Sequence, residues 1–281
     1  MLTLASDFGS PYPAAMKGVL RSHGVADLVD VAHDLPQGDP RAAAFWLRFV
    51  LPEFPPGVHL VVVDPGVGTD RAAICVRAGD HALVGPDNGC LLPPARALAA
   101  AGDAADGAAA ADPDDAIEVF AVDDADPRSS TFHGRDVFAP AAARVHEVGV
   151  GGIASLDGFV RTEDYDDYAI PSAWIEAETA AGEVLVVDDF GNAVTNVPGE
   201  FLDGRVGETI AVETAAGVRE VPVVETFADV DKHDPLVTVG SHGFVECDAN
   251  QGRGDEAFDL APGRAVTLSF EEAVAATVPT A

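Results

Sequence analysis

The stretch Val58-His-Leu-Val-Val-Val-Asp-Pro-Gly-Val-Gly68 decides the fold of this chain. Its first six residues are rich in valine and leucine and place apolar side chains on both faces of an extended segment, as in a central strand of a parallel sheet. The pattern stops at Asp64, where a proline and two glycines turn the chain. Functional sites in parallel α/β sheets lie at the carboxyl ends of the strands, so Asp64 is a candidate site residue.

Strand and helix patterns alternate on the amino-terminal side of this strand. The first strand pattern ends at Asp7, which therefore occupies the same kind of position as Asp64. Such alternation implies a parallel sheet with helices packed against it. We predict strands over 2–5, 25–31 and 117–122, and helices over 14–22, 40–50 and 137–148.

The pattern changes near Pro171. Beyond it, short alternating strands such as 182–187 and 209–213 are separated by turns, with few helical stretches. We therefore predict an N-terminal parallel-sheet α/β domain over residues 1–170 and a smaller C-terminal all-β domain over residues 171–281.

The charge balance excludes two classes of partner. The 281 residues include 47 acidic and 16 basic side chains, which gives a formal charge of −31 at pH 7. Phosphate backbones and anionic bilayers both require lysine and arginine to replace their counterions. We expect no nucleic-acid and no membrane partner. The 48% of hydrophobic residues is enough for a sizeable folded core.

The acidic residues are spread along the whole chain, and lysine occurs only at Lys17 and Lys232. This distribution favours a halophilic protein over one whose acidic residues are clustered to bind a single cationic partner. The first residues lack the basic start and apolar stretch of a signal peptide, and no apolar run approaches the ~20 residues of a membrane span. The three cysteines form no close pair. We expect a cytoplasmic protein with reduced thiols.

Six motifs follow one another along the chain: Ser6-Asp-Phe-Gly, Met16-Lys-Gly18, Val63-Asp-Pro-Gly-Val-Gly-Thr-Asp-Arg71, Gly85-Pro-Asp-Asn-Gly89, Thr131-Phe-His-Gly-Arg-Asp-Val-Phe-Ala-Pro140 and Asp188-Asp-Phe-Gly-Asn-Ala-Val-Thr-Asn196. In this order they resemble the S-adenosyl-L-methionine (SAM) hydroxide adenosyltransferases, adenosine-forming SAM hydrolases related to the fluorinase and chlorinase. The resemblance implies a C-terminal domain of barrel-like shape and a homotrimer that binds substrate between the N-domain of one chain and the C-domain of its neighbour.

The resemblance also implies roles for individual residues. Asp64, Arg71 and His133 match the set that handles the attacking water, and Asp64 also belongs to the substrate site. Asp7 matches the residue that binds the ribose hydroxyls. In the second domain, the matching positions are Asp188 at the methionine ammonium, Phe190 and Asn192 at the adenosine, and Ser241 and Glu246 in a binding segment. His242 departs from the arginine that the halogenase uses for the methionine carboxylate.

The implied reaction needs an activated water but no acid, because the sulfonium leaves from C5′ as a neutral thioether. Converting water to free hydroxide at pH 7 costs about 12 kcal/mol, whereas alignment supplies about 7–11 kcal/mol. A fixed positive charge and a proton acceptor would supply the remainder. Sequence reasoning gives the first role to Arg71 and the second to neutral His133, with Asp64 orienting both.

Three alternatives stay open at this point. A module that binds SAM or adenosine without significant turnover would need no water-activating set. A SAM-dependent halogenase is disfavoured because residues 71–88 run without the halogenase insertion. A metal-dependent phosphoesterase is disfavoured because this chain has no HxH or HExxH spacing, although acidic and histidine side chains could gather at one sheet edge. We expect no metal and no cofactor, with SAM as substrate and adenosine as product. The residues behind the metal alternative are His33, Asp34, Asp64, Asp87, His133 and Asp136.

Overall fold

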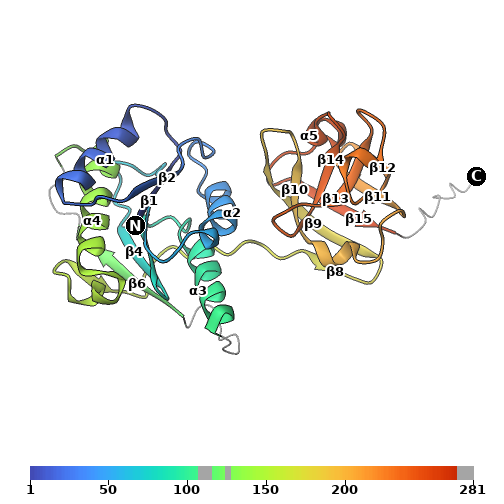
Figure 1. Ribbon diagram of the computed structural model, residues 1–281. Coiled ribbons are helices and arrows are strands. Elements are labelled where there is room, and N and C mark those ends of the chain that lie inside the picture. Colours follow the sequence, from blue (N-terminus) through green and yellow to red (C-terminus); the bar gives the residue numbers. More distant parts are fainter. Residues whose placement is uncertain (107–115, 124–127, 271–281) are drawn as a thin grey trace, which may run out of the picture. The chain divides into compact units, whose positions relative to one another are not determined.

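The computed structural model describes residues 1–106, 116–123 and 128–270 (Figure 1). Its backbone divides into two compact units, Met1–Ala169 and Ile170–Ala281. Residues 271–281 of the predicted second domain lie outside the described residues. Each unit has its own sheet, with two hydrophobic clusters in the first unit and one in the second, so each is described by itself.

The first unit contains a seven-stranded mixed sheet with the strand order β2-β1-β3-β5-β4-β6-β7. The first four strands in this order pair in parallel, as the sequence predicts. From β5 outward the pairs are antiparallel, because β4 and β5 form a hairpin around Gly79, whose φ is 55°. The strands are β1 Leu2–Ser6, β2 Leu28–Ala32, β3 Val58–Val62, β4 Ala73–Ala78, β5 His81–Pro86, β6 Ile117–Val122 and β7 Phe159–Arg161.

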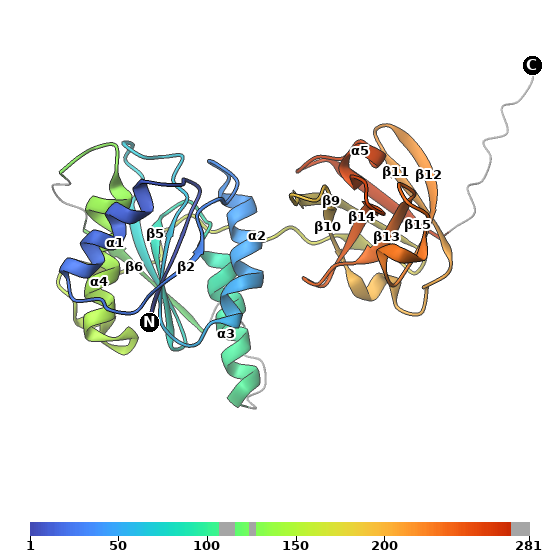
Figure 2. The ribbon, with the colours of Figure 1, turned by 45° about the horizontal axis from the view of Figure 1, so that its top comes forward.

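Helices cover both faces of this sheet (Figure 2). On one face lie α1 and α4, and on the other α2 and α3. The predicted helix over 40–50 is confirmed, and the Asp39 side chain caps it by accepting from the Arg41 and Ala42 amides at 3.0 Å. The helices and short helical turns are α1 Tyr12–Ser22, α2 Pro40–Val50, α3 Leu92–Asp106, α4 Ala139–Val148, η1 Leu51–Glu53, η2 Gly134–Phe138 and η3 Val150–Ser155.

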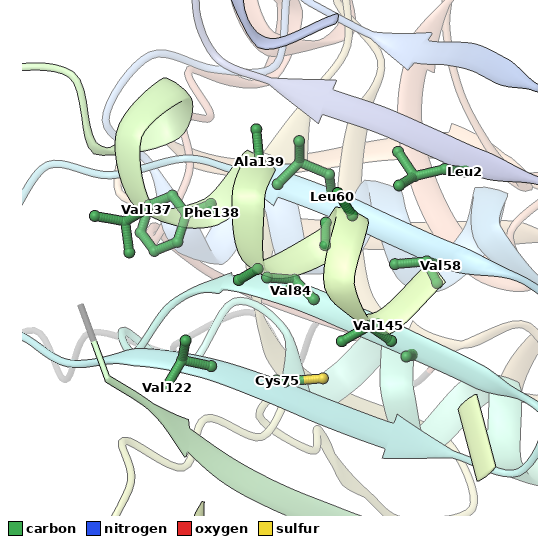
Figure 3. Packing of buried hydrophobic residues seen from close by; sticks show 14 of the residues in the cluster. Leu2, Val58, Leu60, Cys75, Val84, Val122, Val137, Phe138, Ala139 and Val145 are labelled. Carbon is green, nitrogen blue, oxygen red and sulfur yellow. The ribbon is translucent and has the colours of Figure 1, made fainter. Parts of the chain in front are cut away.

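Strand β3 supplies side chains to both cores of the first unit. Leu60 and Val62 pack into the cluster beneath α4, whereas Val61, and Val63 just after the strand, pack into the cluster beneath α2 and α3. Figure 3 shows the first cluster, where Phe138 and residues of α4 meet the sheet. Both faces of the strand are buried, so only its carboxyl end can present residues to a ligand. Asp64 lies there, two residues beyond Val62.

The second unit is an antiparallel sheet of eight strands, and its path runs β12-β11-β15-β9-β10-β14-β13 with β8 paired to β9. A bridge between Val223 and Val237 brings the two ends of this path together, so the sheet is nearly closed and barrel-like. The α/β class of the first unit and the all-β class of the second are both confirmed. The elements are β8 Trp174–Ile175, β9 Thr179–Val187, β10 Ala193–Pro198, η4 Gly199–Leu202, β11 Thr209–Thr214, β12 Gly217–Pro222, η5 Phe227–Asp229, β13 Pro235–Val239, β14 Phe244–Ala249, α5 Gly254–Phe258 and β15 Ala265–Ser269.

Candidate active site

The structure brings Asp64, Arg71 and His133 into direct contact at the carboxyl end of β3. Nε of Arg71 donates to Oδ1 of Asp64 at 2.7 Å, and Nη2 donates to Oδ2 of the same carboxylate. Nη2 also lies 3.0 Å from Nδ1 of His133. A two-bond fork of this kind fixes the plane of the guanidinium as well as its position.

The surroundings of Arg71 hold its guanidinium still. Nη1 donates to the Ala72 carbonyl at 3.0 Å, and Cζ lies 4.8 Å from the centre of the Phe138 ring. Only 10% of the Arg71 side chain and 7% of the Asp64 side chain are exposed. Removing one member of so buried a pair would leave a charge without compensation, at a cost of about 3–5 kcal/mol.

The Arg71 contact sets the tautomer of His133. A guanidinium has only donors, so Nδ1 of His133 accepts the hydrogen bond and carries no hydrogen. The hydrogen of a neutral His133 therefore resides on Nε2. His133 as a whole is 7% exposed and stands directly before the π-helical turn Gly134–Phe138.

A cavity of about 200 Å³ lies beside this set. Asp7, Asp64 and His133 all line it, so three of the predicted site residues of the first unit meet there, with Arg71 bonded behind two of them. The Asp7 carboxylate is held at the end of β1 because its Oδ2 accepts from the Gly38 amide at 2.7 Å. The lining residues are Asp7, Phe8, Tyr12, Val62, Asp64, Val67, Thr131, Phe132, His133 and Gly134.

One wall of this cavity is aromatic, and the sequence patterns did not indicate it. The rings of Phe8, Tyr12 and Phe132 contact one another edge to face, with centres 5.3–6.1 Å apart. Phe8 and Phe132 are the chain neighbours of Asp7 and His133, so their positions next to predicted site residues could have indicated them. Tyr12 lies on α1 and carried no such signal.

In the second unit, Asp188, Phe190 and Asn192 lie in the single turn that joins β9 to β10. Oδ1 of Asp188 accepts from the amides of Phe190 and Asn192, both at 2.9 Å, and Oδ2 accepts from the Asn192 side chain at 3.1 Å. The carboxylate thereby shapes the turn. Phe190 is 78% exposed, which leaves its ring available to a ligand.

Ser241 and Glu246 belong to the neighbouring β13–β14 hairpin. Ser241 is exposed in the connection, whereas Glu246 is 7% exposed on β14 and bonds Nε2 of His242 through Oε1 at 2.8 Å. A Cβ on Gly240 would come within 2.5 Å of both bonding atoms, so a larger residue at this position would force the pair to shift. Strands β10 and β14 are paired, and Val194 opposite Glu246 is two residues from Asn192.

A second carboxyl group, Asp248, lies two residues beyond Glu246 on β14 and was not predicted. Neither of its oxygens contacts a donor among the described residues, and the side chain is fully buried. Burial raises the pKa of Asp248 far above its ordinary value, and the neighbouring Glu246 and Asp188 carboxyls raise it further. The two-residue spacing places both carboxyls on one side of the strand and could have indicated the pair.

Across residues 1–106, 116–123 and 128–270, no three histidine, cysteine or acidic side chains are grouped so as to hold a metal ion. Within the same residues, no helix has the length and apolar character required to cross a bilayer.

Comparison with family models matches both units. Residues 2–151 match the SAM hydroxide adenosyltransferase N-terminal domain, and residues 182–267 match the C-terminal domain of the same family.

Curated relatives and solved structures match nearly the whole chain. A protein of Salinispora tropica named (R)-S-adenosyl-L-methionine hydrolase is 39% identical over 268 residues, covering 93% of this chain and 95% of the relative. A protein of the same name from Thermus thermophilus is 40% identical over 278 residues, covering 94% and 97%. The structure of an uncharacterized conserved protein from Thermotoga maritima has a TM-score of 0.76 and 29% identity, with 96% of this chain and 100% of that chain covered.

Proposed function

Because this chain belongs to the SAM hydroxide adenosyltransferase family, we propose that it hydrolyses S-adenosyl-L-methionine to adenosine and L-methionine. The observation that carries the proposal is the contact of Asp64, Arg71 and His133 beside a cavity that Asp7 also lines. A module that only binds its ligand has no need of a buried, donor-rich set of this kind.

In the proposed reaction the water oxygen attacks C5′ of SAM as the C5′–S bond breaks. The electron pair of that bond passes to sulfur, which leaves as the neutral thioether of methionine, and one proton is released. No group has to protonate the leaving atom. The residues therefore serve to place the water and to stabilise the charge that develops on its oxygen.

The geometry favours a division of roles different from the one that the sequence suggested. Nδ1 of His133 is already the acceptor of a bond from Arg71, so the nitrogen with a hydrogen to offer is Nε2. His133 then holds the attacking oxygen by donating to it, and Arg71 supplies the fixed positive charge. Asp64 is the acceptor of the set and takes the proton through a remaining lone pair.

The other site residues take the substrate's remaining groups. Asp7 accepts from the ribose hydroxyls, which suits a carboxylate at a strand end. On the second unit, Phe190 stacks on adenine beside Asn192, and Asp188 faces the methionine ammonium. Ser241 and Glu246 complete the binding segment.

The assembly and the cofactor requirement are part of the same proposal. The enzyme is a homotrimer in which the substrate meets the N-terminal unit of one chain and the C-terminal unit of its neighbour, and it works without a metal or a cofactor. Light scattering in high salt tests the trimer, and turnover that persists with a chelator tests the metal independence. The cytoplasmic location expected from the sequence stays a prediction.

The decisive experiment is a product assay. Purified protein is incubated with SAM in high salt, with and without chloride, and the nucleoside is identified by mass. We expect adenosine in both cases, and a loss of at least about 100-fold in rate for Arg71→Ala. Arg161→Ala is the matched control, because Arg161 is an exposed arginine that pairs with Glu118. A chlorinated nucleoside would indicate a halogenase, and bound SAM without any product would indicate a binding module.

A further inference from the structure

The segment from His33 to Gly38 is bonded to the end of β1 at three points. Nδ1 of His33 lies 2.7 Å from Oγ of Ser6, and the Leu35 amide donates to the Ser6 carbonyl at 3.3 Å. The Gly38 amide then donates to Oδ2 of Asp7 at 2.7 Å. One short segment after β2 therefore holds both the backbone before Asp7 and its carboxylate.

The Ser6 hydroxyl extends this hold to the wall of the cavity. Ser6 is fully buried, and its Oγ donates to the Phe8 carbonyl at 3.0 Å. A hydroxyl has one hydrogen, so when Ser6 donates to Phe8 the Nδ1–H of His33 donates to Ser6. A His33 ring that also donates from Nε2 to the Asp30 carboxylate carries a hydrogen on both nitrogens. Asp7 and Phe8 both line the cavity, so the bond from His33 bears on two of its lining residues.

The far side of the His33 ring faces charged groups of two other elements. Nε2 lies 3.0 Å from Oδ1 of Asp30 on β2, and Oδ2 of Asp30 accepts from Nζ of Lys17 on α1 at 2.6 Å. Asp30 is 46% exposed and Lys17 is 34% exposed, so this outer pair contributes little free energy. The outer contact with Asp30 orients the His33 ring, whereas the inner bond connects the ring to Ser6 and, through Ser6, to the cavity.

We propose that His33 is a positioning residue for ribose binding. It acts through Ser6 and through the segment from His33 to Gly38, which together hold the Asp7 carboxylate toward the cavity. The inference rests on the proposed function, because it assigns the ribose to Asp7. It adds a residue that touches no substrate and that lies 26 positions along the chain from the residue it positions.

Two substitutions separate the inner bond from the outer one. The amide nitrogen of asparagine reaches the position of an imidazole Nδ1, whereas that of glutamine reaches the position of Nε2. His33→Asn therefore keeps a donor for Ser6, and His33→Gln keeps a donor for Asp30. Lys17→Ala is the matched control, because it removes the Lys17–Asp30 ion pair and leaves both bonds of His33 in place.

The test is adenosine binding by calorimetry, which needs no turnover, with thermal melts to show that each variant is folded. We expect His33→Gln to weaken adenosine binding about five- to tenfold, the loss that follows from one hydrogen bond of ordinary strength. His33→Asn and Lys17→Ala should bind within about twofold of wild type. Methionine binding should be unchanged in all three.

A double-mutant cycle with Asp7→Asn asks whether His33 acts through Asp7. In the Asp7→Asn background, His33→Gln should weaken adenosine binding by less than it does in the wild-type background. Equal losses in His33→Asn and His33→Gln, or additive losses with Asp7→Asn, would overturn the inference while leaving the proposed function intact. A folded wild-type protein that binds no adenosine would overturn both.

Discussion

Arg71 and His133 are joined by a hydrogen bond whose direction is fixed, with Nη2 of the guanidinium 3.0 Å from Nδ1 of the imidazole. Arginine can only donate, so the lone pair of Nδ1 is occupied and the other ring nitrogen carries the hydrogen. A histidine in this state offers a donor to the cavity. The role of His133 in catalysis is therefore open to a test by substitution.

His133→Gln should retain part of the activity, because the glutamine amide reaches the position of Nε2 and carries hydrogens to donate. His133→Ala removes the donor and should lower kcat by about 100- to 1,000-fold, the usual cost of losing one oxyanion donor. We expect glutamine to recover at least tenfold of that loss. Initial rates of the two variants with saturating SAM test whether His133 acts as a donor. Equal rates would contradict this role and favour His133 as the proton acceptor.

The fold was largely predictable, because burial on both faces leaves a strong signal in a strand such as Val58–Val62. The hairpin of β4 and β5 was not predicted, although Gly79-Asp80 between two apolar runs is a turn signal. Its consequence is the antiparallel half of the sheet. Helix α1 begins at Tyr12, two residues before the predicted start, because Pro13 fits the first turn of a helix.

Only those site residues whose positions follow from local sequence patterns could be predicted. Asp7 and Asp64 stand at strand ends, which sequence patterns locate well. The direction of the Arg71–His133 bond and the full burial of Asp248 depend on residues far apart in the chain. Neither local preference nor spacing carries that information, so both required the packed structure.

His59 should make the protein sensitive to acid. It is fully buried on β3, with Nδ1 2.8 Å from Thr3 Oγ1 and Nε2 2.9 Å from His81 Nδ1. Burial, and then the nearby His81, lower the pKa of His59 from 6.5 to about 3. The unfolded chain therefore binds a proton that the folded chain does not, so stability is lost as the pH falls from about 6.5 toward 3.

Urea unfolding at fixed salt between pH 4 and pH 7 measures this effect. His59→Phe should be less stable than wild type at pH 7, because Thr3 and His81 lose their partner, but the gap should narrow as the pH falls. His23→Gln removes an exposed histidine and should follow the wild-type curve. A gap that stays constant with pH would contradict a low pKa for His59.

The formal charge of −31 should make stability depend on salt. Raising KCl from 0.1 M to 1 M shortens the screening length from about 10 Å to about 3 Å, which weakens repulsion among the carboxylates. We expect the melting temperature to rise with KCl through the molar range. Sucrose stabilises folded proteins without screening charge and serves as the comparison. Equal melting temperatures in low and high KCl would refute the halophilic interpretation.

The buried Asp248 should make the folded protein less stable as the pH rises. Its pKa is raised by burial and by Glu246, so the folded chain keeps a proton that the unfolded chain gives up above its ordinary carboxyl pKa of 3.8. The contribution of this group is therefore full in acid and declines as the pH passes through neutrality toward the raised value. Asp248→Asn has no carboxyl proton to lose and stays uncharged at every pH. It should be more stable than wild type at pH 8 by about 1–3 kcal/mol, with the difference shrinking toward pH 4. Asp231→Asn, an exposed counterpart, should show no such trend in urea unfolding. A variant less stable than wild type at pH 8 would mean that Asp248 is ionised and stabilised by a partner.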